Sequence, residues 1–255
     1  YDIKDINSLN YLQELIMAMT QNEQKELVAS TAIDTLIKDK KIFSGMKIGL
    51  GTGSTAIPAV KHLAKRINDG TLKDIKAVVT SFGTQNLCEE LGIPVYSMND
   101  KIIGGHLDLA IDGADEVDPK NNVIKGGGAA LLREKIVAYN SDQFVVVADS
   151  TKIVDSLGTK FPLPVEIIGE ARVPVAKALN ALGAECTLRE GVKKCGPVIT
   201  DNGNQILDIV WKNPVDSELM EDKINSIVGV VEVGFFTKNK PIVFTMDSNE
   251  KVIQR

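Results

Sequence analysis

Short apolar stretches alternate with segments of helical periodicity over the first 150 residues, and this alternation limits the possible folds more than any other feature. The apolar stretches lie at residues 46–50, 75–80, 107–112 and 143–149, and Gly or Ser directly follows each one. Apolar runs of this length predict strands, and helical segments between them predict parallel pairing, because parallel strands need a crossover connection. We therefore expect an α/β fold with a Rossmann-like, mostly parallel sheet and helices on both faces.

The order of the predicted elements changes after residue 160. The dipeptide Asn202-Gly203 predicts a hairpin turn, and the elements around it approach the β-α-β-β-α-β order of a ferredoxin-like unit. Those elements are a strand at 164–168, a helix at 170–182, a strand at 184–190, hairpin strands at 198–201 and 205–211, a helix at 216–227 and a strand at 230–235.

These patterns predict two domains. Residues 1–160 and 237–255 would form the α/β catalytic domain, with residues 1–22 as an N-terminal extension, and residues 161–236 would form a smaller, ferredoxin-like α+β domain. Two last strands, at 241–246 and 251–254, are expected to return to the first domain.

Charge and cysteine content exclude several classes of function. The net charge is −5, with both signs mixed along the chain and no basic stripe, so we expect neither nucleic acid nor a membrane surface as a partner. No apolar run approaches the ~18 residues of a membrane span. Three cysteines without CxxC spacing predict reduced thiols, and hence a cytoplasmic protein.

The first predicted strand ends in a glycine-rich turn, residues 51–56 (GTGSTA), that leads into a helix. Glycines let the backbone approach a ligand closely, and the helix N-terminus favours a phosphate, with hydroxyls from Thr52, Ser54 and Thr55 as further donors. The motif also fits a dinucleotide fingerprint, but that fingerprint needs an acid after the second strand, where this chain has Thr80-Ser81. A plain tight turn is the third interpretation.

The third predicted strand ends in an acidic turn that contains Asp112, Gly113, Ala114 and Asp115. Ligands of open α/β sheets bind at the carboxyl ends of the strands, and two carboxylates three residues apart can grip or deprotonate sugar hydroxyls. A metal site is the alternative, although position three of an EF-hand pattern would be Ala114. A solvated acidic turn is the remaining interpretation.

Lys125 and three glycines precede a predicted helix at residues 129–139. We expect Lys125 to be a mobile cation for a phosphate or an oxyanion. Glu134 on this helix has apolar neighbours at helical spacing, so its carboxylate is expected to be buried, with a raised pKa suited to a proton-transferring base. The alternative is a structural ion pair of Glu134 with Arg133, Lys135 or a more distant cation.

Together these segments resemble the A-type ribose-5-phosphate isomerases. The resemblance runs in order from about residue 23 to the C-terminus, which makes the set of motifs far more specific than any one of them. The chain departs from the family at its N-terminal extension and at residues 81–84, where many members have a more hydroxyl-rich turn. The motifs are GTGSTA at 51–56, DGAD at 112–115, KGGGAALLREK at 125–135, and further matches at 148–152, 161–166 and 198–204.

The resemblance implies an aldose-ketose isomerase that interconverts D-ribose 5-phosphate and D-ribulose 5-phosphate in the non-oxidative pentose phosphate pathway. It implies a cis-enediolate intermediate, no metal or other cofactor, and a homodimer or homotetramer. Glu134 would move a proton between C2 and C1, and Lys125 would stabilise the enediolate oxygen or the phosphate. Asp112 and Asp115 would bind sugar hydroxyls and help to open the furanose ring. The substrate-binding residues would be Thr52, Gly53, Ser54, Thr55, Asp112, Gly113, Ala114, Asp115, Lys125, Gly126, Gly127, Gly128 and Lys152.

Two other classes of function compete with this prediction. A non-catalytic sugar-phosphate sensor would keep the phosphate turn and usually add a DNA-binding segment, but the N-terminal segment here is short and not basic. An NAD-dependent oxidoreductase is disfavoured because the acid that would bind the ribose is missing.

Overall fold

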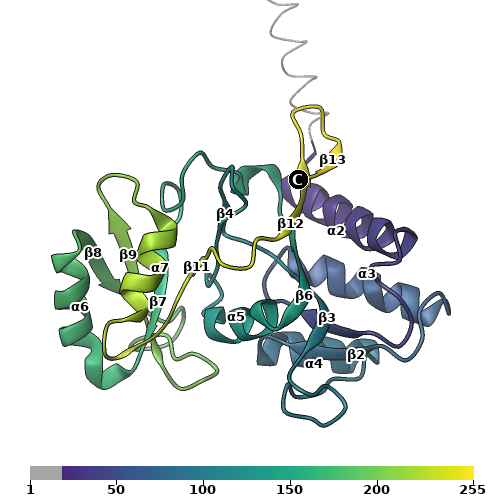
Figure 1. The fold of residues 1–255 in the computed structure, drawn as a ribbon, viewed down its shortest axis with the longest axis horizontal. Helices are drawn as coiled ribbons and strands as arrows, with labels where there is room; N and C mark the ends of the chain where they lie inside the picture. The colour runs from purple at the N-terminus through teal and green to yellow at the C-terminus, as the bar shows by residue number, and fades with distance from the viewer. Residues whose placement is uncertain (1–18) are drawn as a thin grey trace, which may run out of the picture.

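A six-stranded sheet forms the larger part of the molecule in the computed structural model, which describes residues 19–255 (Figure 1). Its strand order is β13-β12-β6-β3-β1-β2, and every neighbouring pair is parallel except β12 and β13. The predicted mostly parallel sheet is therefore confirmed, as is the return of the C-terminal strands to it. Most of the predicted N-terminal extension lies outside the described residues. The strands are β1 (Lys47–Leu50), β2 (Lys76–Val79), β3 (Leu107–Asp112), β6 (Ser141–Val147), β12 (Ile242–Met246) and β13 (Val252–Gln254).

Helices cover both faces of this sheet, as predicted. Leu109 and Ile111 of β3 pack with α2 and α3, whereas Ala110 between them packs on the opposite face with α5. This alternation follows from the period of two in a strand. The helix α4 ends at Gly92, whose φ of 73° gives the expected left-handed cap. The helices are α2 (Gln21–Lys38), α3 (Ala56–Asn68), α4 (Phe82–Leu91) and α5 (Leu131–Tyr139).

The order of strands in the sheet sets the place of the site. From β1 the chain moves outward to β2, and it then returns to place β3 on the other side of β1. Such a reversal leaves a crevice between the carboxyl ends of β1 and β3, where ligands of open α/β sheets bind. Residues 51–55 follow β1 and residues 112–115 end β3, so both predicted ligand turns meet at this crevice.

Residues 163–233 form a separate antiparallel sheet with two helices. Its strand order is β10-β7-β9-β8, which is the arrangement of a ferredoxin-like unit. Its hydrophobic core also contains Ile124 and Leu157, which lie before residue 161 in the sequence. The division into domains at residues 161 and 236 therefore stays a proposal. The elements are β7 (Leu163–Ile167), the 3₁₀ turn η2 (Gly169–Ala171), α6 (Arg172–Ala181), β8 (Ala184–Leu188), β9 (Gln205–Trp211), α7 (Ser217–Asn225) and β10 (Val230–Val233).

Two predictions for this region are wrong. Residues 198–201 are not a strand, because β8 is the antiparallel partner of β9 and the Thr200 side chain instead donates to buried Glu166. The predicted strand 230–235 breaks at Gly234, where a Cβ would lie 2.5 Å from the Lys125 carbonyl oxygen. Beyond Gly234 the chain joins a three-stranded sheet. Its strands are β4 (Glu116–Val117), β5 (Val123–Ile124) and β11 (Phe235–Phe236).

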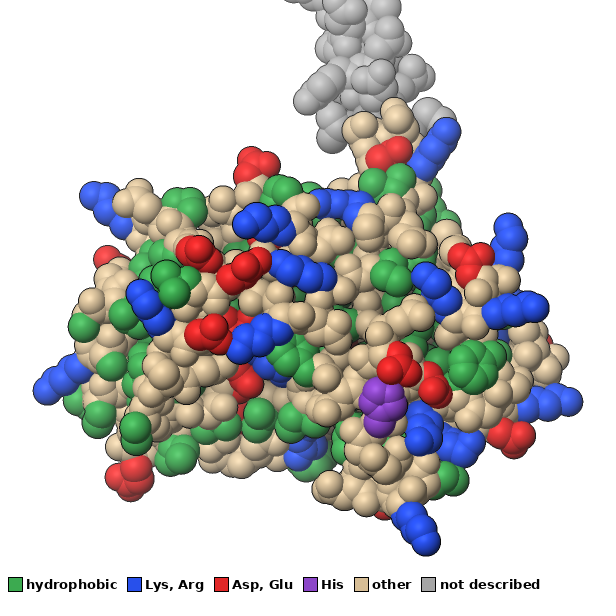
Figure 2. All heavy atoms as spheres, in the orientation of Figure 1, with side chains coloured by type: hydrophobic (Ala, Val, Ile, Leu, Met, Phe, Trp, Pro, Cys, Tyr) green, Lys and Arg blue, Asp and Glu red, His purple; other side chains and the backbone are tan. Residues whose placement is uncertain are grey.

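The surface in Figure 2 carries Lys, Arg, Asp and Glu side chains interspersed over the face shown. This agrees with the mixed charge pattern of the sequence. Within residues 19–255, no helix combines the length and the apolar character that crossing a bilayer would need.

Candidate active site

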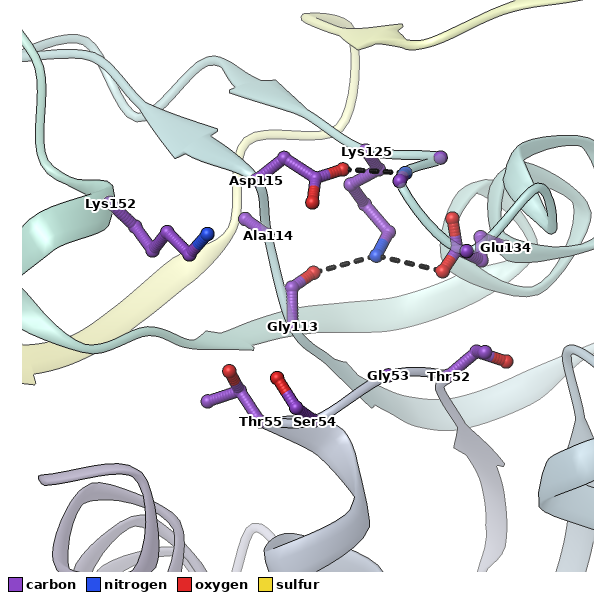
Figure 3. Close-up of a pocket in the computed structure, with 13 residues that line it drawn as sticks. Thr52, Gly53, Ser54, Thr55, Gly113, Ala114, Asp115, Lys125, Glu134 and Lys152 are labelled. Atoms are coloured by element: carbon purple, nitrogen blue, oxygen red, sulfur yellow. Dashed lines mark hydrogen bonds and ion pairs between the residues drawn. The ribbon is translucent and has the colours of Figure 1, made fainter. Parts of the chain in front are cut away.

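A cavity lies at the crevice between β1 and β3, and its volume is about 400 Å³ when the solvent space at its opening is included. Thirteen residues line it, and they include Glu134 and every predicted substrate-binding residue except Asp112 (Figure 3). Segments far apart in the sequence therefore meet as predicted. The lining residues are Thr52, Gly53, Ser54, Thr55, Gly113, Ala114, Asp115, Lys125, Gly126, Gly127, Gly128, Glu134 and Lys152.

Lys125 lies at the centre of the charged groups. Its side chain is only 2% exposed, and Nζ lies 2.9 Å from Asp112 Oδ2, 3.2 Å from Glu134 Oε1 and 2.6 Å from the Gly113 carbonyl oxygen. The expectation of a mobile cation is therefore wrong, because three acceptors fix the ammonium in place. Burial opposes its charge, but Asp112 and Glu134 outweigh this effect and raise the pKa of Lys125 to about 12.

Asp112 lies behind Lys125 and does not line the cavity. Its carboxylate also accepts hydrogen bonds from the backbone N–H groups of Gly113, at 2.7 Å, and Thr52, at 3.1 Å. Gly51 makes this approach possible, since a Cβ there would lie 1.9 Å from Asp112 Oδ1. Burial raises the pKa of the Asp112 carboxyl, whereas Lys125 and the two N–H groups lower it. The geometry favours support of Lys125 over the expected grip on sugar hydroxyls.

Glu134 is buried, as the apolar neighbours on its helix predict. One oxygen, Oε1, pairs with Lys125, and Oε2 accepts no hydrogen bond from the described residues. Burial raises the pKa of Glu134 to about 8, Lys125 opposes the rise, and Asp112 and Asp115 add to it. Of the cations considered for a structural pair, Arg133 and Lys135 both bind elsewhere. A carboxylate with this pKa and a free oxygen can accept and return a proton near neutral pH.

Asp115 and Glu134 both line the cavity and lie on either side of the Lys125 side chain (Figure 3). Its Oδ2 accepts a hydrogen bond of 2.8 Å from the Gly127 N–H, so the acidic turn and the glycine loop fix each other. Close contact requires a glycine here, because a Cβ on Gly127 would lie 2.6 Å from Asp115 Oδ1. This arrangement leaves Oδ1 as an acceptor at the cavity wall.

Hydroxyls and ammonium groups gather at the end of the cavity beside α3. Ser54 and Thr55 precede this helix, and the Thr55 side chain makes no capping hydrogen bond. Lys152 extends toward the cavity from the 3₁₀ turn η1 (Ser150–Lys152) (Figure 3). Lys25 of α2 donates to Ser54 Oγ at 3.0 Å and has no ion-pair partner among the described residues. Two cations, two hydroxyls and a helix N-terminus suit a phosphate.

Sequence reasoning missed Lys25 and misassigned the Thr52 hydroxyl. The available signal for Lys25 was its position on an otherwise apolar face of its helix. The Thr52 hydroxyl turns away from the cavity and contacts the hydroxyls of Thr80, Ser81 and Thr84 at 2.6–3.2 Å. Thr52 therefore lines the cavity without offering its hydroxyl, and the end of β2 has hydroxyls where a dinucleotide site would need an acid.

Among the described residues, no group of three or more His, Cys, Asp or Glu side chains has the geometry of a metal site. The acids at the cavity instead surround Lys125, which occupies the position between Asp112 and Glu134. We keep the absence of a metal from the reaction as a prediction that a chelator tests.

Several proteins of one known family are similar to this chain in sequence and in structure. The sequence profile of ribose 5-phosphate isomerase A (phosphoriboisomerase A) matches residues 76–250. The ribose-5-phosphate isomerase A of Treponema denticola is 59% identical over 236 residues, which cover 92% of this chain and 99% of the relative. The solved structure of ribose 5-phosphate isomerase A from Methanocaldococcus jannaschii matches with a TM-score of 0.83 and 40% identity, covering 92% of this chain and all of that one. A D-ribose-5-phosphate isomerase solved in complex with phospho-erythronic acid matches with a TM-score of 0.84 and 40% identity over 93% of this chain and all of the other.

Proposed function

Because the chain belongs to the ribose 5-phosphate isomerase A family, we propose that the cavity between β1 and β3 is the active site of this isomerase. The enzyme interconverts D-ribose 5-phosphate and D-ribulose 5-phosphate. The observation that carries the assignment of the site is the free Oε2 of Glu134, buried beside the Lys125 ammonium at a cavity rich in phosphate donors. The relative that was solved with phospho-erythronic acid supports a sugar phosphate as the ligand.

In the proposed reaction, Glu134 removes the proton from C2 of the open-chain aldose. The electron pair of that C–H bond forms the C1–C2 double bond, and the carbonyl oxygen becomes the negatively charged oxygen of a cis-enediolate. Glu134 then delivers the proton to C1, while the hydroxyl proton of O2 passes to O1. One base serves both carbons, because they are neighbours and the enediolate keeps them in one plane with their oxygens.

Lys125 would stabilise the charge that develops on the enediolate oxygens. Its ammonium is already oriented by Asp112 and the Gly113 carbonyl, so little reorganisation is needed when the charge appears. Burial strengthens the interaction, since the effective dielectric constant is lower than in water. In this proposal Asp112 positions Lys125, and Asp115, which lines the cavity, binds sugar hydroxyls and assists ring opening.

The phosphate would lie against Ser54, Thr55, Lys152 and Lys25, at the N-terminus of α3. Binding energy from this distant group would hold the reacting carbons at Glu134. Free ribose lacks this group and is expected to be a far poorer substrate.

We also propose that the enzyme is a homodimer or homotetramer and works in the cytoplasm. The assembly rests on the family resemblance, and light scattering of the purified protein tests it. The compartment is supported by Cys88, Cys186 and Cys195, which are free thiols in the structure.

The test of the function is the formation of ribulose 5-phosphate from ribose 5-phosphate by the purified protein, before and after treatment with EDTA. We expect the same rate in both preparations, because Lys125 takes the place that a divalent cation would fill between the carboxylates. A rate that vanishes with EDTA and returns with a divalent ion would contradict the metal-free reaction. No isomerisation at all would contradict the function.

A further inference from the structure

The ferredoxin-like region, residues 161–236, supplies none of the residues that line the cavity. It nevertheless contacts the segment of residues 125–135, which carries both Lys125 and Glu134. Arg189, which directly follows β8, contacts the glycine loop: its Nη1 donates to the carbonyl oxygens of Gly126 and Gly127, at 2.9 and 3.1 Å.

Asp208 on the neighbouring strand β9 fixes the Arg189 side chain. Nε of Arg189 donates to Asp208 Oδ2 at 2.8 Å, and Nη2 donates to Oδ1 at 2.5 Å. The guanidinium is planar, so this two-point grip also sets the direction of Nη1. Both side chains are largely buried, at 15% and 20% exposure, which limits the screening of the pair by water.

These bonds reach the cavity through the peptide planes of the glycine loop. The Gly126 carbonyl shares its planar peptide unit with the Gly127 N–H, and the Gly127 carbonyl shares the next unit with the Gly128 N–H. The Gly127 N–H donates to Asp115, and Gly128 lines the cavity. By holding both carbonyl oxygens, Arg189 constrains these two peptide planes and with them the directions of the Gly127 and Gly128 N–H groups.

A loop of this composition needs such support. Gly126, Gly127 and Gly128 lack side chains that could anchor them, and glycine has the largest backbone freedom of any residue. Gly126 adopts a φ of +104° and Ala129 a φ of +56°, so the loop passes through two left-handed positions before α5 begins. Its geometry depends on contacts from outside, and Arg189 supplies two of them.

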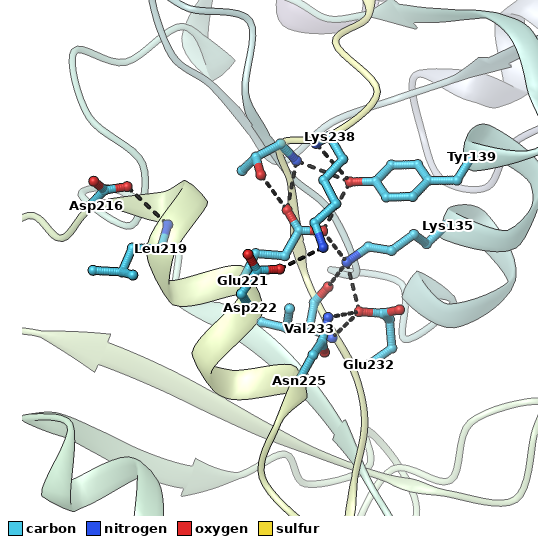
Figure 4. A network of polar contacts seen from close by, with 11 residues as sticks. Lys135, Tyr139, Asp216, Leu219, Glu221, Asp222, Asn225, Glu232, Val233 and Lys238 are labelled. Carbon is cyan, nitrogen blue, oxygen red and sulfur yellow. Dashed lines mark hydrogen bonds and ion pairs between the residues drawn. The ribbon is translucent and has the colours of Figure 1, made fainter.

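The same region also holds α5 on both sides of the base. Arg133 donates to Asn202 Oδ1 at 2.9 Å and to the Asp201 carbonyl at 3.0 Å. Lys135 pairs with Glu221 at 3.1 Å and with Glu232 at 2.7 Å (Figure 4).

Successive residues on a helix point about 100° apart. Because the neighbours on each side of Glu134 are anchored, the rotation of the helix about its axis is fixed, and with it the direction of the Glu134 side chain.

We propose that Arg189 is a positioning residue for the isomerisation, through which the ferredoxin-like region sets the geometry of the glycine loop between Lys125 and Glu134. This inference rests on the proposed function of the cavity. It assigns to Arg189 an effect on turnover, although the side chain does not itself line the cavity and contacts no residue that would move a proton.

The experiment compares Arg189→Gln with Arg66→Gln in the isomerase assay. Arg66 is a matched control, since its Nε and Nη2 grip Asp34 in the same two-point manner, both at 2.8 Å, on a surface remote from the cavity. Misplacement of reacting groups by about 1 Å can cost ~10²-fold, so we expect kcat of Arg189→Gln to fall by roughly 10–100-fold with KM changed much less. Arg66→Gln should keep the wild-type kcat.

A second variant allows a measurement whose result would not change if Arg189 only stabilised the fold. Arg189→Ala should regain part of its kcat when guanidinium chloride is added below denaturing concentrations, because the free ion can occupy the position between Asp208 and the glycine carbonyls. Arg66→Ala should show no such gain. If Arg189→Gln cannot be purified in folded form, Asp208→Asn replaces it, with an expected smaller loss of kcat.

The outcomes separate the two proposals. Wild-type kcat in the Arg189 variants, with no response to guanidinium and with loss of thermal stability alone, would overturn the positioning role while leaving the isomerase intact. Absence of isomerisation in the wild type and the Arg66 control would instead overturn the proposed function, and this inference with it.

Discussion

Replacing Glu134 by Gln tests the proposed base and the burial of its charge at the same time. The amide keeps the size and shape of the side chain but cannot take a proton from C2. Loss of a general base typically lowers kcat by ~10²–10⁴-fold, and we expect a fall in this range with little change in KM, because the amide can still hydrogen-bond a hydroxyl.

The same substitution should stabilise the fold. Burial raises the pKa of Glu134 from its ordinary value of 4.5 to about 8, so the folded protein holds a proton there that the unfolded chain releases. The free energy of unfolding therefore falls as the pH rises from 4.5 to 8. At about 1.4 kcal/mol per pH unit, this cost reaches roughly 3 kcal/mol at pH 7 and about 5 kcal/mol above pH 8. Glutamine removes the cost, and the gain in stability should grow with pH over that interval.

Thermal unfolding and steady-state kinetics on one preparation, at several values between pH 5 and 9, measure both effects. A gain of about 3 kcal/mol corresponds to a rise in Tm of roughly 6–12 °C for a chain of this size. Glu90→Gln, an exposed position on α4, is the control for the chemical change alone. If Glu134 only forms a structural pair with Lys125, the variant should lose stability and keep its turnover, and near-normal kcat would refute the assignment of the base.

Two further predictions concern the remaining charged groups. Lys152→Met should raise KM for ribose 5-phosphate at least ~10-fold and leave the slow reaction of free ribose unchanged, because only ribose 5-phosphate carries the phosphate that Lys152 would bind. An equal loss of activity with both sugars would contradict a role of Lys152 in phosphate binding. Asp112→Asn removes a carboxylate that raises the pKa of Glu134, so the rise of kcat/KM with pH, expected near pH 8 in the wild type, should move to lower pH. Asp115→Asn, the comparison at the cavity wall, should mainly raise KM, and identical pH profiles in both variants would contradict the separate roles.

Features that depend on local sequence could be predicted well. The helix stop at Gly92 follows from the conformational freedom of glycine, and the burial of Glu134 follows from the apolar periodicity of its helix. These predictions needed only periodicity and the conformational freedom of glycine. The meeting of residues 51–55 with residues 112–115 was implied by the family resemblance, and the structure shows its basis, since β1 and β3 are neighbouring strands.

Features that depend on tertiary contacts could not be predicted. Asp112 and Asp115 look equivalent in the sequence, and only the structure shows that Asp112 pairs with Lys125 without lining the cavity, whereas Asp115 lines it. The support of the glycine loop by Arg189 joins residues 62 and 63 positions apart. The dipeptide Asn202-Gly203 forms a turn, as predicted. Thr200 and Asn202, however, donate hydrogen bonds to the Glu166 carboxylate, and residues 198–201 do not form the expected strand.

The environment of Lys125 explains why two carboxylates are needed around one ammonium group. The ion pair with Lys125 acts to lower the pKa of Glu134, and a strongly stabilised carboxylate is a poor base. Asp112 accepts two backbone N–H bonds in addition to its contact with Lys125, and these donors oppose the rise in its pKa that burial causes. Its negative charge then raises the pKa of Glu134, which burial has already raised. On the proposed mechanism, Asp112 orients the lysine that stabilises the enediolate, and its charge offsets part of the lowering that this lysine exerts on the pKa of the base beside it.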